Sequence, residues 1–449
     1  MWSIKEFSLG LSGFHHLNKD SLARAAYLIG QNAGQSFSRI LGNSFRQTVA
    51  GIFSKDKMTT SQMLEGHVHA TVERCKSSDS ARIIVAQDTT YYNYSGHKQM
   101  EGLGPIQGSV KGIIQHNTLA ADEQGVPLGL LHQHNWTRTG AGAFENESEK
   151  WFEGLEAVNQ HLGSIDKSVV LVQDREADIF AFFKAKRAKN VDLVVRVFQR
   201  RKLEVLPDKD VAGLYDAIKT LDQLGTYQTT IRRKNRPVQL TLSVQASPVN
   251  VLPGKDLSVQ LHKTTGLSIV VAQEIAAVDS KGQDCFVPDA AVRWILLTSL
   301  ETSTLQQACQ IIDHYSARWI VERLHYTLKS GSLKVERLQF DDVLTMFNAL
   351  AMYTIVAWRI LSLTISVRQE PDQNPKKHFT DLEMKILTSK YPKANESLKN
   401  ALRALGNLVN FVPSTAQPLP GVKIMAEAIR KLNDISQAIK NIYEDPLQD

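Results

Sequence analysis

Hydrophobic positions in the first 76 residues follow the spacing of helices. Apolar side chains recur at helical spacing in two stretches, strictly in the first and loosely in the second. These positions are Leu22, Ala26 and Ile29, and then Met63, Val68 and Val72. Residues 30–42, between them, are punctuated by Gly, Ser and Asn, which is typical of a loop. The pattern predicts a helical domain over residues 1–76.

From residue 81 the pattern changes to short apolar runs rich in β-branched side chains, which is typical of buried strands. The runs are ARIIVAQD (81–88), GIIQHNTLAAD (112–122), GLLHQHNWTR (129–138) and SVVLVQD (168–174). An amphipathic stretch at 149–162 precedes the last run and predicts a helix. Strands combined with helices favour an α/β core, which we expect over residues 77–367.

Residues 194–298 have the pattern of mostly extended chain. YQTTIRRK, VQLTLSVQA and LSIVVAQE combine alternation with β-branched residues, as antiparallel strands do. Helix-forming sequence resumes only near Leu305. We therefore expect a β-rich insertion, at about 197–300, within the α/β core.

Two apolar patterns follow. Residues 347–367 are long and apolar enough to span a bilayer, but Arg359 lies near their middle, where a charge in a membrane is costly. This predicts a buried core helix and no membrane partner.

After a polar, proline-bearing linker, helical spacing predicts a helical domain over residues 368–449. The spacing is carried by Leu398, Leu402, Leu405 and Val409, and then by Ile424, Ala428, Ile435 and Ile439.

Composition narrows the class of protein without identifying it. The 449 residues are 43% apolar and 22% charged, as in a soluble globular protein. The 52 Lys and Arg against 46 Asp and Glu give a net charge of +6, which permits a nucleic-acid partner without establishing one. Cys75, Cys285 and Cys309 lack C-x-x-C spacing, and the N-terminus lacks a signal-peptide pattern. We therefore expect a cytoplasmic protein.

Two acidic residues end predicted strands. Asp88 closes ARIIVAQD, and Asp174 closes SVVLVQD. Open α/β sheets place their ligands at the carboxyl ends of parallel strands, so the two acids could share a divalent cation. Taken singly, each acid is better explained as a turn residue or a helix N-cap, and it is the presence of two such strands in one domain that favours a shared cation. Glu176 and Asp178 follow, and we attribute them to a helix N-terminus, whose dipole favours acids, and not to metal ligands.

The stretch IIDHYSARWIVERLHYTLKSG (311–331) predicts one helix. At about 100° per residue, Tyr315, Arg318, Glu322 and Lys329 fall within an arc of roughly 60°. A solvated stripe of charges has the same pattern. If this face lines a site, Glu322 adds a third carboxylate to the two strand-end acids. Two divalent ions held by the three could activate water against a phosphodiester.

These residues resemble the signature of a known family. QDTT at Asp88, QDREADI at Asp174 and the spacing Tyr-x2-Arg-x3-Glu-x6-Lys from Tyr315 to Lys329 are similar to DDE transposases of bacterial insertion sequences, in the subgroup with a Y-R-E-K signature. Further similar segments, in matching order, are GLLHQHNW, ESEKW (147–151), DLVVRV, KNRP (234–237) and RWILLTS (293–299). The resemblance extends from about residue 45 to residue 359 and continues weakly beyond.

The resemblance implies a ribonuclease H-like core with a β-rich insertion, and it implies that Asp88, Asp174 and Glu322 are catalytic and hold two Mg²⁺ or Mn²⁺ ions. The implied reaction is cut-and-paste transposition. Hydrolysis at the element end frees a 3′-hydroxyl, a hairpin forms and is opened by water, and the 3′-hydroxyl then joins target DNA. The implied partners are double-stranded DNA, read by the N-terminal domain, and a second copy of the chain, bound through the C-terminal helices.

The resemblance also implies a set of DNA contacts. They are Tyr315, Arg318 and Lys329 on phosphates near a flipped base, Trp294 stacked on that base, Arg196 near the hairpin, and Trp319, Lys234 and Arg236 as further contacts. From burial tendency alone, a Trp in a strand is more often a core residue, but base flipping needs an aromatic face. Tyr326 departs from the family pattern, which has a lysine there. One phosphate contact is then lost or supplied from elsewhere.

Basic residues gather near these positions. One set is Lys184, Lys186, Arg187 and Lys189, with Arg196, Arg200, Arg201 and Lys202 just beyond, and another is Arg232, Arg233, Lys234 and Arg236. They predict a DNA path beside the active site, although a solvated basic face has the same pattern.

Two other functions fit parts of the sequence. A catalytically silent transposase-derived DNA-binding protein, or an inhibitor of transposition, would have no need of all three acids. A different metal-dependent nuclease would have no need of the signature helix with Trp294. We therefore expect a transposase in the bacterial cytoplasm that acts at the nucleoid.

Overall fold

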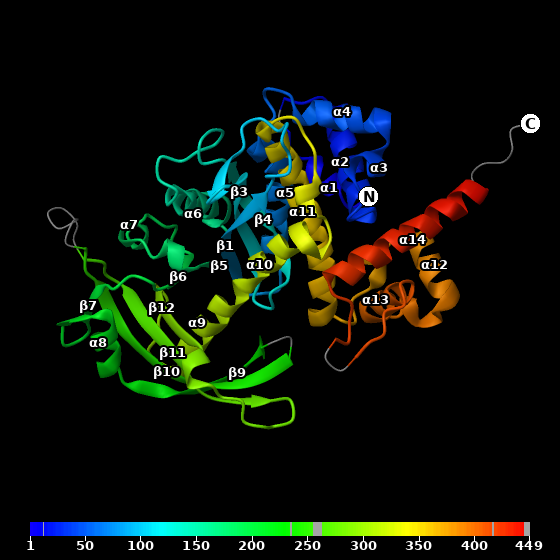
Figure 1. Ribbon diagram of the computed structural model, residues 1–449. Helices are drawn as coiled ribbons and strands as arrows, with labels where there is room; N and C mark the ends of the chain where they lie inside the picture. Colours follow the sequence, from blue (N-terminus) through cyan, green and yellow to red (C-terminus); the bar gives the residue numbers. More distant parts are fainter. Residues whose placement is uncertain (12, 234–235, 255–262, 415–416, 444–449) are drawn as a thin grey trace, which may run out of the picture. The chain divides into compact units, whose positions relative to one another are not determined.

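Two compact units make up the chain in the computed structural model, which describes residues 1–11, 13–233, 236–254, 263–414 and 417–443 (Figure 1). The first unit contains residues 1–79, 89–147 and 320–449. The second unit contains residues 80–88 and 148–319. The first unit is therefore assembled from three separate parts of the sequence and includes the helices near both chain ends.

Helices form the N-terminal part of the first unit. They are α1 (Ile4–Phe7), α2 (His16–Gln31), α3 (Phe37–Leu41), α4 (Asn43–Phe53) and α5 (Thr60–Ser77). The predicted helical pattern is confirmed, but the expected loop at 30–42 is wrong in part because α3 lies inside it. The hydroxyl of Ser36 caps α3 by accepting the N–H of Arg39 at 3.3 Å, and Phe37 and Leu41 are buried.

The first unit also contains antiparallel strands and a long buried helix. In the described residues, β3 (Val110–Asp122) pairs with β2 (Gly104–Gln107) and β4 (Pro127–Trp136), and α11 (Val343–Gln369) packs against β4. By length and hydropathy, α11 is the one helix of the described residues that could cross a membrane, but 83% of its most apolar window is buried inside the protein. The prediction of a buried core helix at 347–367 is confirmed.

Shorter helices flank α11. Before it come α10 (Trp319–Tyr326), the π-helical turn η4 (Thr327–Gly331) and η5 (Val335–Arg337). After it come η6 (Pro375–Lys377), α12 (Asp381–Lys390), η7 (Pro392–Asn395), α13 (Leu398–Asn407) and α14 (Val422–Tyr443). Leu398, Leu402 and Leu405 are buried in one core with Leu363 of α11, which confirms the predicted apolar face of α13.

The second unit is built on a large mixed sheet. Residues 82–86 of β1 (Arg82–Asn93) pair in parallel with β5 (Ser168–Gln173), which pairs in parallel with β6 (Val191–Arg196). The helix α6 (Glu149–Leu162) precedes β5 as predicted, and η1 (Arg175–Ala177) and α7 (Phe180–Phe183) connect β5 to β6. From β1 onward the strand order of this unit is β1-β5-β6-β12-β11-β10-β7-β8, with β9 paired to β10.

Beyond β6 the sheet is antiparallel, and the predicted extended block is confirmed. The strands are β7 (Lys202–Val205), β8 (Asp210–Gly213), β9 (Gln223–Arg233), β10 (Arg236–Val251), β11 (Leu267–Asp279) and β12 (Arg293–Thr298), with α8 (Leu214–Thr220) and η3 (Pro288–Ala290) between them. The helix α9 (Leu305–Ala317) lies across the sheet (Figure 1) and buries Ile311 and Ile312 against Val170 and Leu296. The chain is therefore a mixed α/β protein.

Candidate active site

Asp88 and Asp174 lie at the same level of two adjacent strands, just beyond the point where their parallel pairing ends. The last residues paired between β1 and β5 are Ala86 and Val172, two positions before each acid. The glutamines between the paired residues and the acids are joined by a 2.5 Å hydrogen bond. Because side chains two positions apart share a face of a strand, both carboxylates lie on one face of the sheet.

The two acids differ in how they relate to their strands. Asp174 directly follows β5, as predicted. Asp88 does not end β1, because the strand continues to Asn93. The residues TTYYN that follow Asp88 are mostly β-branched or aromatic and favour extended chain. The expectation that Asp88 closes its strand is therefore wrong, although Asp88 lies just beyond the pairing with β5.

Both carboxylates have a cationic neighbour, and one has an unsatisfied oxygen. Nη1 of Arg318 lies 3.7 Å from Oδ2 of Asp88, and Nε of Arg175 lies 3.9 Å from Oδ1 of Asp174. Oδ1 of Asp174 is buried and accepts no hydrogen bond from the described residues. A buried carboxylate oxygen without a donor is costly, and coordination to a hard cation would satisfy it. The acid pair therefore fits one side of a Mg²⁺ or Mn²⁺ site.

Glu322 lies on α10 and is half-buried. It belongs to the first unit, whereas Asp88 and Asp174 belong to the second. In the described part of the chain, no group of three or more His, Cys, Asp or Glu side chains is arranged to hold a metal ion. The metal site with three carboxylates stays a prediction.

The predicted helix over 311–331 is confirmed as helical chain, but the expectation of one continuous helix is wrong. Arg318 occupies a turn between α9 and α10, and Lys329 has non-helical angles of φ −89° and ψ −105° within the π-helical turn η4. In η4 the N–H of Ser332 donates a hydrogen bond to the carbonyl of Thr327, five residues back, and this longer spacing widens the helix. Tyr315, Arg318 and Glu322 thus do not share one continuous helix face with Lys329.

The wide turn directs Lys329 toward the backbone of β1. Its Nζ atom donates a 2.8 Å hydrogen bond to the carbonyl of Tyr91. A π-helical turn changes the direction of the side chains that follow it, and such turns are frequent at functional sites. The observed bond holds the ammonium group at one position within the first unit.

Five of the predicted DNA-contacting residues line one cavity of the second unit, of about 660 Å³. They are Arg196, Trp294, Tyr315, Arg318 and Trp319. The rings of Trp294 and Tyr315 meet edge to face with centroids 5.7 Å apart, and the guanidinium of Arg318 lies 5.9 Å from the Tyr315 centroid. These residues come from β6, β12, α9, the turn after α9 and the first residue of α10, so the fold brings together side chains that are more than a hundred residues apart.

The cavity combines aromatic surface with positive charge. Burial raises the pKa of the Tyr315 phenol, while the charges of Arg318 and Arg196 oppose that increase. Trp294 is half-buried, and Trp319 is 56% exposed. Exposed rings beside guanidinium groups suit a base next to a phosphate. The cavity therefore has the chemistry of a nucleotide site.

Other residues of the cavity wall were not predicted as site residues. They are Thr229, Thr230, Ile231, Arg232, Pro237 and Ser316. Arg232 was recognisable only as a member of a basic cluster, and Pro237 only through its KNRP segment. Of the remaining predicted contacts, Arg236 is exposed at the start of β10, and Lys234 lies outside the described residues.

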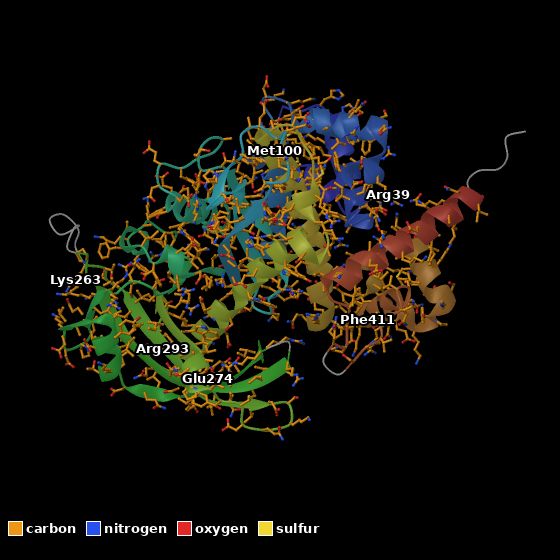
Figure 2. All side chains as sticks on the ribbon, viewed as in Figure 1. Arg39, Met100, Lys263, Glu274, Arg293 and Phe411 are labelled. Carbon is orange, nitrogen blue, oxygen red and sulfur yellow. The ribbon has the colours of Figure 1, made fainter. Side chains whose placement is uncertain are left out.

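Two arginines of the predicted basic DNA path are held in ion pairs with buried acids, and the path itself stays a prediction. Arg201 Nε lies 2.6 Å from the buried carboxylate of Asp178. Arg233 Nη2 lies 2.5 Å from Glu274, which is buried on β11 (Figure 2). Buried acids of this kind hold cations in place as structural partners. Each arginine therefore has a structural partner, which a solvated cation lacks.

Asp178 and Glu176 have partners outside the helix N-terminus to which they were attributed. The Asp178 carboxylate accepts the backbone N–H groups of Phe198 and Gln199 at 2.8 and 2.6 Å. Glu176 bonds Lys150 of α6 at 2.9 Å. The dipole interpretation is therefore wrong for Asp178, which fixes the chain after β6. The expectation that neither acid is a metal ligand stays a prediction.

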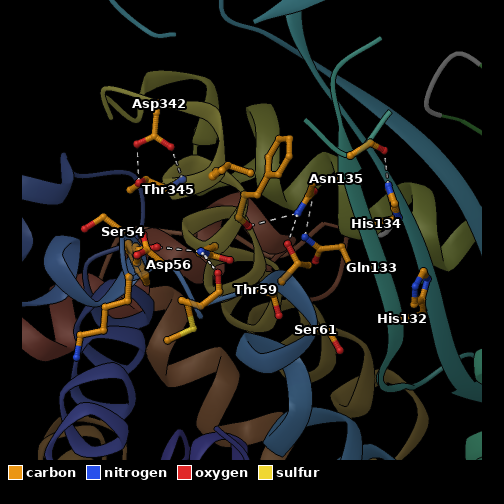
Figure 3. Close-up of a pocket in the computed structure, with 18 residues that line it drawn as sticks. Ser54, Asp56, Thr59, Ser61, His132, Gln133, His134, Asn135, Asp342 and Thr345 are labelled. Carbon is orange, nitrogen blue, oxygen red and sulfur yellow. Dashed lines mark hydrogen bonds between the residues drawn. The ribbon is translucent and has the colours of Figure 1, made fainter. Parts of the chain in front are cut away.

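A second cavity, of about 600 Å³, lies in the first unit (Figure 3). Its polar floor includes Asn135, whose amide donates to Thr60 Oγ1 at 3.2 Å and to the carbonyl of Phe347 at 3.3 Å. Asp342 also lines it and caps α11 through Thr345. None of the predicted site residues lines this cavity.

Comparison with known proteins bears on the second unit above all. Residues 147–359 match the family model described as "Transposase DDE domain", a range that includes Asp174, Trp294 and Glu322. The whole chain also aligns with 79% of the chain in a solved structure of the piggyBac transposase synaptic complex with hairpin DNA, at 11% identity and a TM-score of 0.38. Residues 147–359, a little under half of the chain, are therefore similar to a transposase DDE domain.

Proposed function

We propose that this protein is a cut-and-paste DNA transposase of the Y-R-E-K subgroup. It binds the ends of its element, hydrolyses a phosphodiester there, passes through a DNA hairpin and joins the freed 3′-hydroxyl to target DNA. The observation that carries the proposal is the acid pair just beyond the parallel pairing of β1 with β5, with a buried oxygen of Asp174 that lacks a hydrogen-bond donor.

Asp88, Asp174 and Glu322 are the residues that would hold two Mg²⁺ or Mn²⁺ ions. Such ions, when bound, lower the pKa of water and stabilise the leaving oxygen of a phosphodiester. Arg318, 3.7 Å from Asp88, offsets the carboxylate charge that would otherwise repel a phosphate. Oδ1 of Asp174 supplies an acceptor that no described residue already uses.

The cavity of the second unit would hold the DNA strand beside these acids. Its arginines, Arg196 and Arg318, would bond backbone phosphates, and the indole of Trp294 would stack on a base that has left the duplex. Tyr315, which touches Trp294, would keep the indole in place. Trp319 and Arg236, both exposed, would contact the same DNA.

The parallel strands β1, β5 and β6, covered by α9, support a ribonuclease H-like core that β7–β12 interrupt as an insertion. In this proposal residues 1–76 recognise element ends, and residues 368–449 form the contact of a homodimer. The protein would act on the nucleoid in a bacterial cytoplasm.

A cleavage assay tests the proposal. The full chain is incubated with a duplex that carries the end of its element and with Mg²⁺, and a hairpin product is expected on a denaturing gel. Asp174→Asn and Glu322→Gln should abolish the product. Glu176→Gln is the matched control, since Glu176 lies next to the site but bonds Lys150. Unchanged cleavage in Asp174→Asn would overturn the proposal, and binding without any cleavage by the wild type would favour a silent DNA-binding protein.

A further inference from the structure

Phe198 is a solvent-exposed aromatic residue of the second unit. The side chain is 62% exposed, although phenylalanine is among the residues most often buried. It follows β6 by two residues, outside the residues that line the cavity with Trp294. Single exposed apolar side chains are common on protein surfaces, so the surroundings of Phe198 decide whether its ring can bind a ligand.

The backbone beneath this ring is held firmly. The N–H groups of Phe198 and Gln199 both donate to the buried carboxylate of Asp178, and the N–H of Val197 donates to the carbonyl of Ile295 at 2.8 Å. Arg201 completes the arrangement by bonding the other oxygen of Asp178 at 2.6 Å. A buried carboxylate is costly to desolvate, and these three donors offset that cost. The loop therefore displays Phe198 in a defined position.

The guanidinium group of Arg175 lies near both the Phe198 ring and the carboxylate of Asp174. Cζ of Arg175 lies 5.8 Å from the centroid of Phe198, and Nε of the same residue lies 3.9 Å from Oδ1 of Asp174. Arg175 is 52% exposed and therefore accessible to a ligand from solvent. The Phe198 ring and the Asp174 carboxylate thus both lie near the guanidinium group of Arg175.

The charge around the ring favours a polyanion. Arg200 and Lys202 are exposed on the same segment. Two acids close in sequence to Arg175 are engaged, because Asp178 is buried and bonds the loop, and Glu176 bonds Lys150. An aromatic face beside cations binds an unstacked base and its phosphate, whereas an apolar protein partner would require a wider apolar surface.

We propose that Phe198 and Arg175 form a stacking platform for an unpaired base of a DNA strand, separate from the cavity that contains Trp294. The platform deepens the proposed function, since it would hold a second base of the strand that reaches Asp174. Stacking on an aromatic ring contributes a sequence-tolerant share of affinity, so the platform would bind any base.

Binding of single strands tests the platform without cleavage. The full chain, in EDTA, is titrated into a 20-nucleotide strand with a central 2-aminopurine, and into the same strand in a perfect duplex. Phe198→Ala should weaken single-strand binding roughly five- to a hundredfold and lose the fluorescence quenching caused by stacking. Phe198→Trp should retain both, and Phe198→Leu should lose both, because leucine is apolar but cannot stack. Duplex binding should change by less than twofold.

Tyr215→Ala is the matched control, because Tyr215 is 48% exposed and Arg293 lies 5.8 Å from its ring. Equal losses in Tyr215→Ala and Phe198→Ala, wild-type binding by Phe198→Leu, or no single-strand binding by the wild type would each overturn the platform. Failure of the proposed function is distinguishable, because it appears as absent cleavage while the Phe198-dependent binding persists.

Discussion

Arg318 places its Nη1 atom 3.7 Å from Oδ2 of Asp88, so a side-chain cation already faces one of the two acids that lie just beyond the pairing of β1 with β5. The pair is largely shielded from water, with 12% of the Arg318 side chain and 21% of the Asp88 side chain exposed. An arginine in this position offsets carboxylate charge before any metal arrives, and it can still turn toward a phosphate.

Arg318→Gln should therefore lower the free energy of unfolding in EDTA by about 1 kcal/mol, since the acid pair loses its nearest cation. Saturating Mn²⁺ should reduce this loss, because bound metal supplies the missing positive charge. Urea unfolding with and without Mn²⁺ measures both. Arg175→Gln is the control and should change stability little, because Arg175 is half exposed and its nitrogen lies 3.9 Å from Asp174. A loss for Arg318→Gln that is identical with and without Mn²⁺ contradicts the idea.

Asp178→Ala should destabilise the second unit by about 3 kcal/mol, because it leaves the Arg201 guanidinium and two backbone N–H groups without their carboxylate. Urea unfolding gives the magnitude, and faster proteolysis near residue 198 would locate the change. Glu176→Gln offers a comparison two residues away: its carboxylate is 59% exposed, so an effect below about 0.5 kcal/mol is expected. Similar losses in the two variants would show that Asp178 has no special structural role.

Long-range partners of this kind limited what the sequence could predict. Local patterns identified α6, β5 and the extended block correctly, because burial on one face is encoded in neighbouring residues. The fate of Arg201 and Arg233 depends on Asp178 and Glu274, which lie 23 and 41 residues away. No local pattern distinguishes such paired arginines from solvated ones.

The helix over 311–331 shows a second limit. Its residues have helical periodicity throughout, and an angular projection assumes that every residue keeps helical geometry. The π-helical turn at Lys329 breaks that assumption, and the helix is also interrupted at Arg318, yet neither place contains a proline or an internal glycine that would mark it. The acids were predictable because they immediately follow runs of buried β residues, whereas the cavity with Trp294 depends on tertiary packing.

Buried His314 should make the second unit sensitive to acid. Burial, reinforced by the charge of Arg82, lowers its pKa from 6.5 to about 4. The unfolded chain therefore binds the proton more readily, so stability present above pH 6.5 is lost as the pH falls toward 4. At pH 5.5 the expected cost is about 1 kcal/mol. Comparing urea unfolding at pH 7.5 and 5.5 measures it.

His314→Gln should remove that share of the pH dependence, while His16→Gln, a change at an exposed position, should leave it intact. An unaltered pH dependence in His314→Gln would mean that other groups are responsible.

Tyr326 occupies the position at which the family pattern has a lysine, and its ring is 39% exposed with the guanidinium of Arg323 at 4.9 Å. If this position faces the DNA backbone, Tyr326→Lys adds one phosphate contact. The slope of log affinity against log salt concentration should then steepen by about 0.9, because one more counterion is released on binding. Titrations of an element-end duplex across a range of KCl concentrations measure the slope. Tyr326→Phe keeps the ring without adding charge and should leave the slope unchanged. If the slope in Tyr326→Lys equals that of the wild type, this position lies away from the DNA. The presence of Tyr326 in place of lysine then has no effect on how this protein binds DNA.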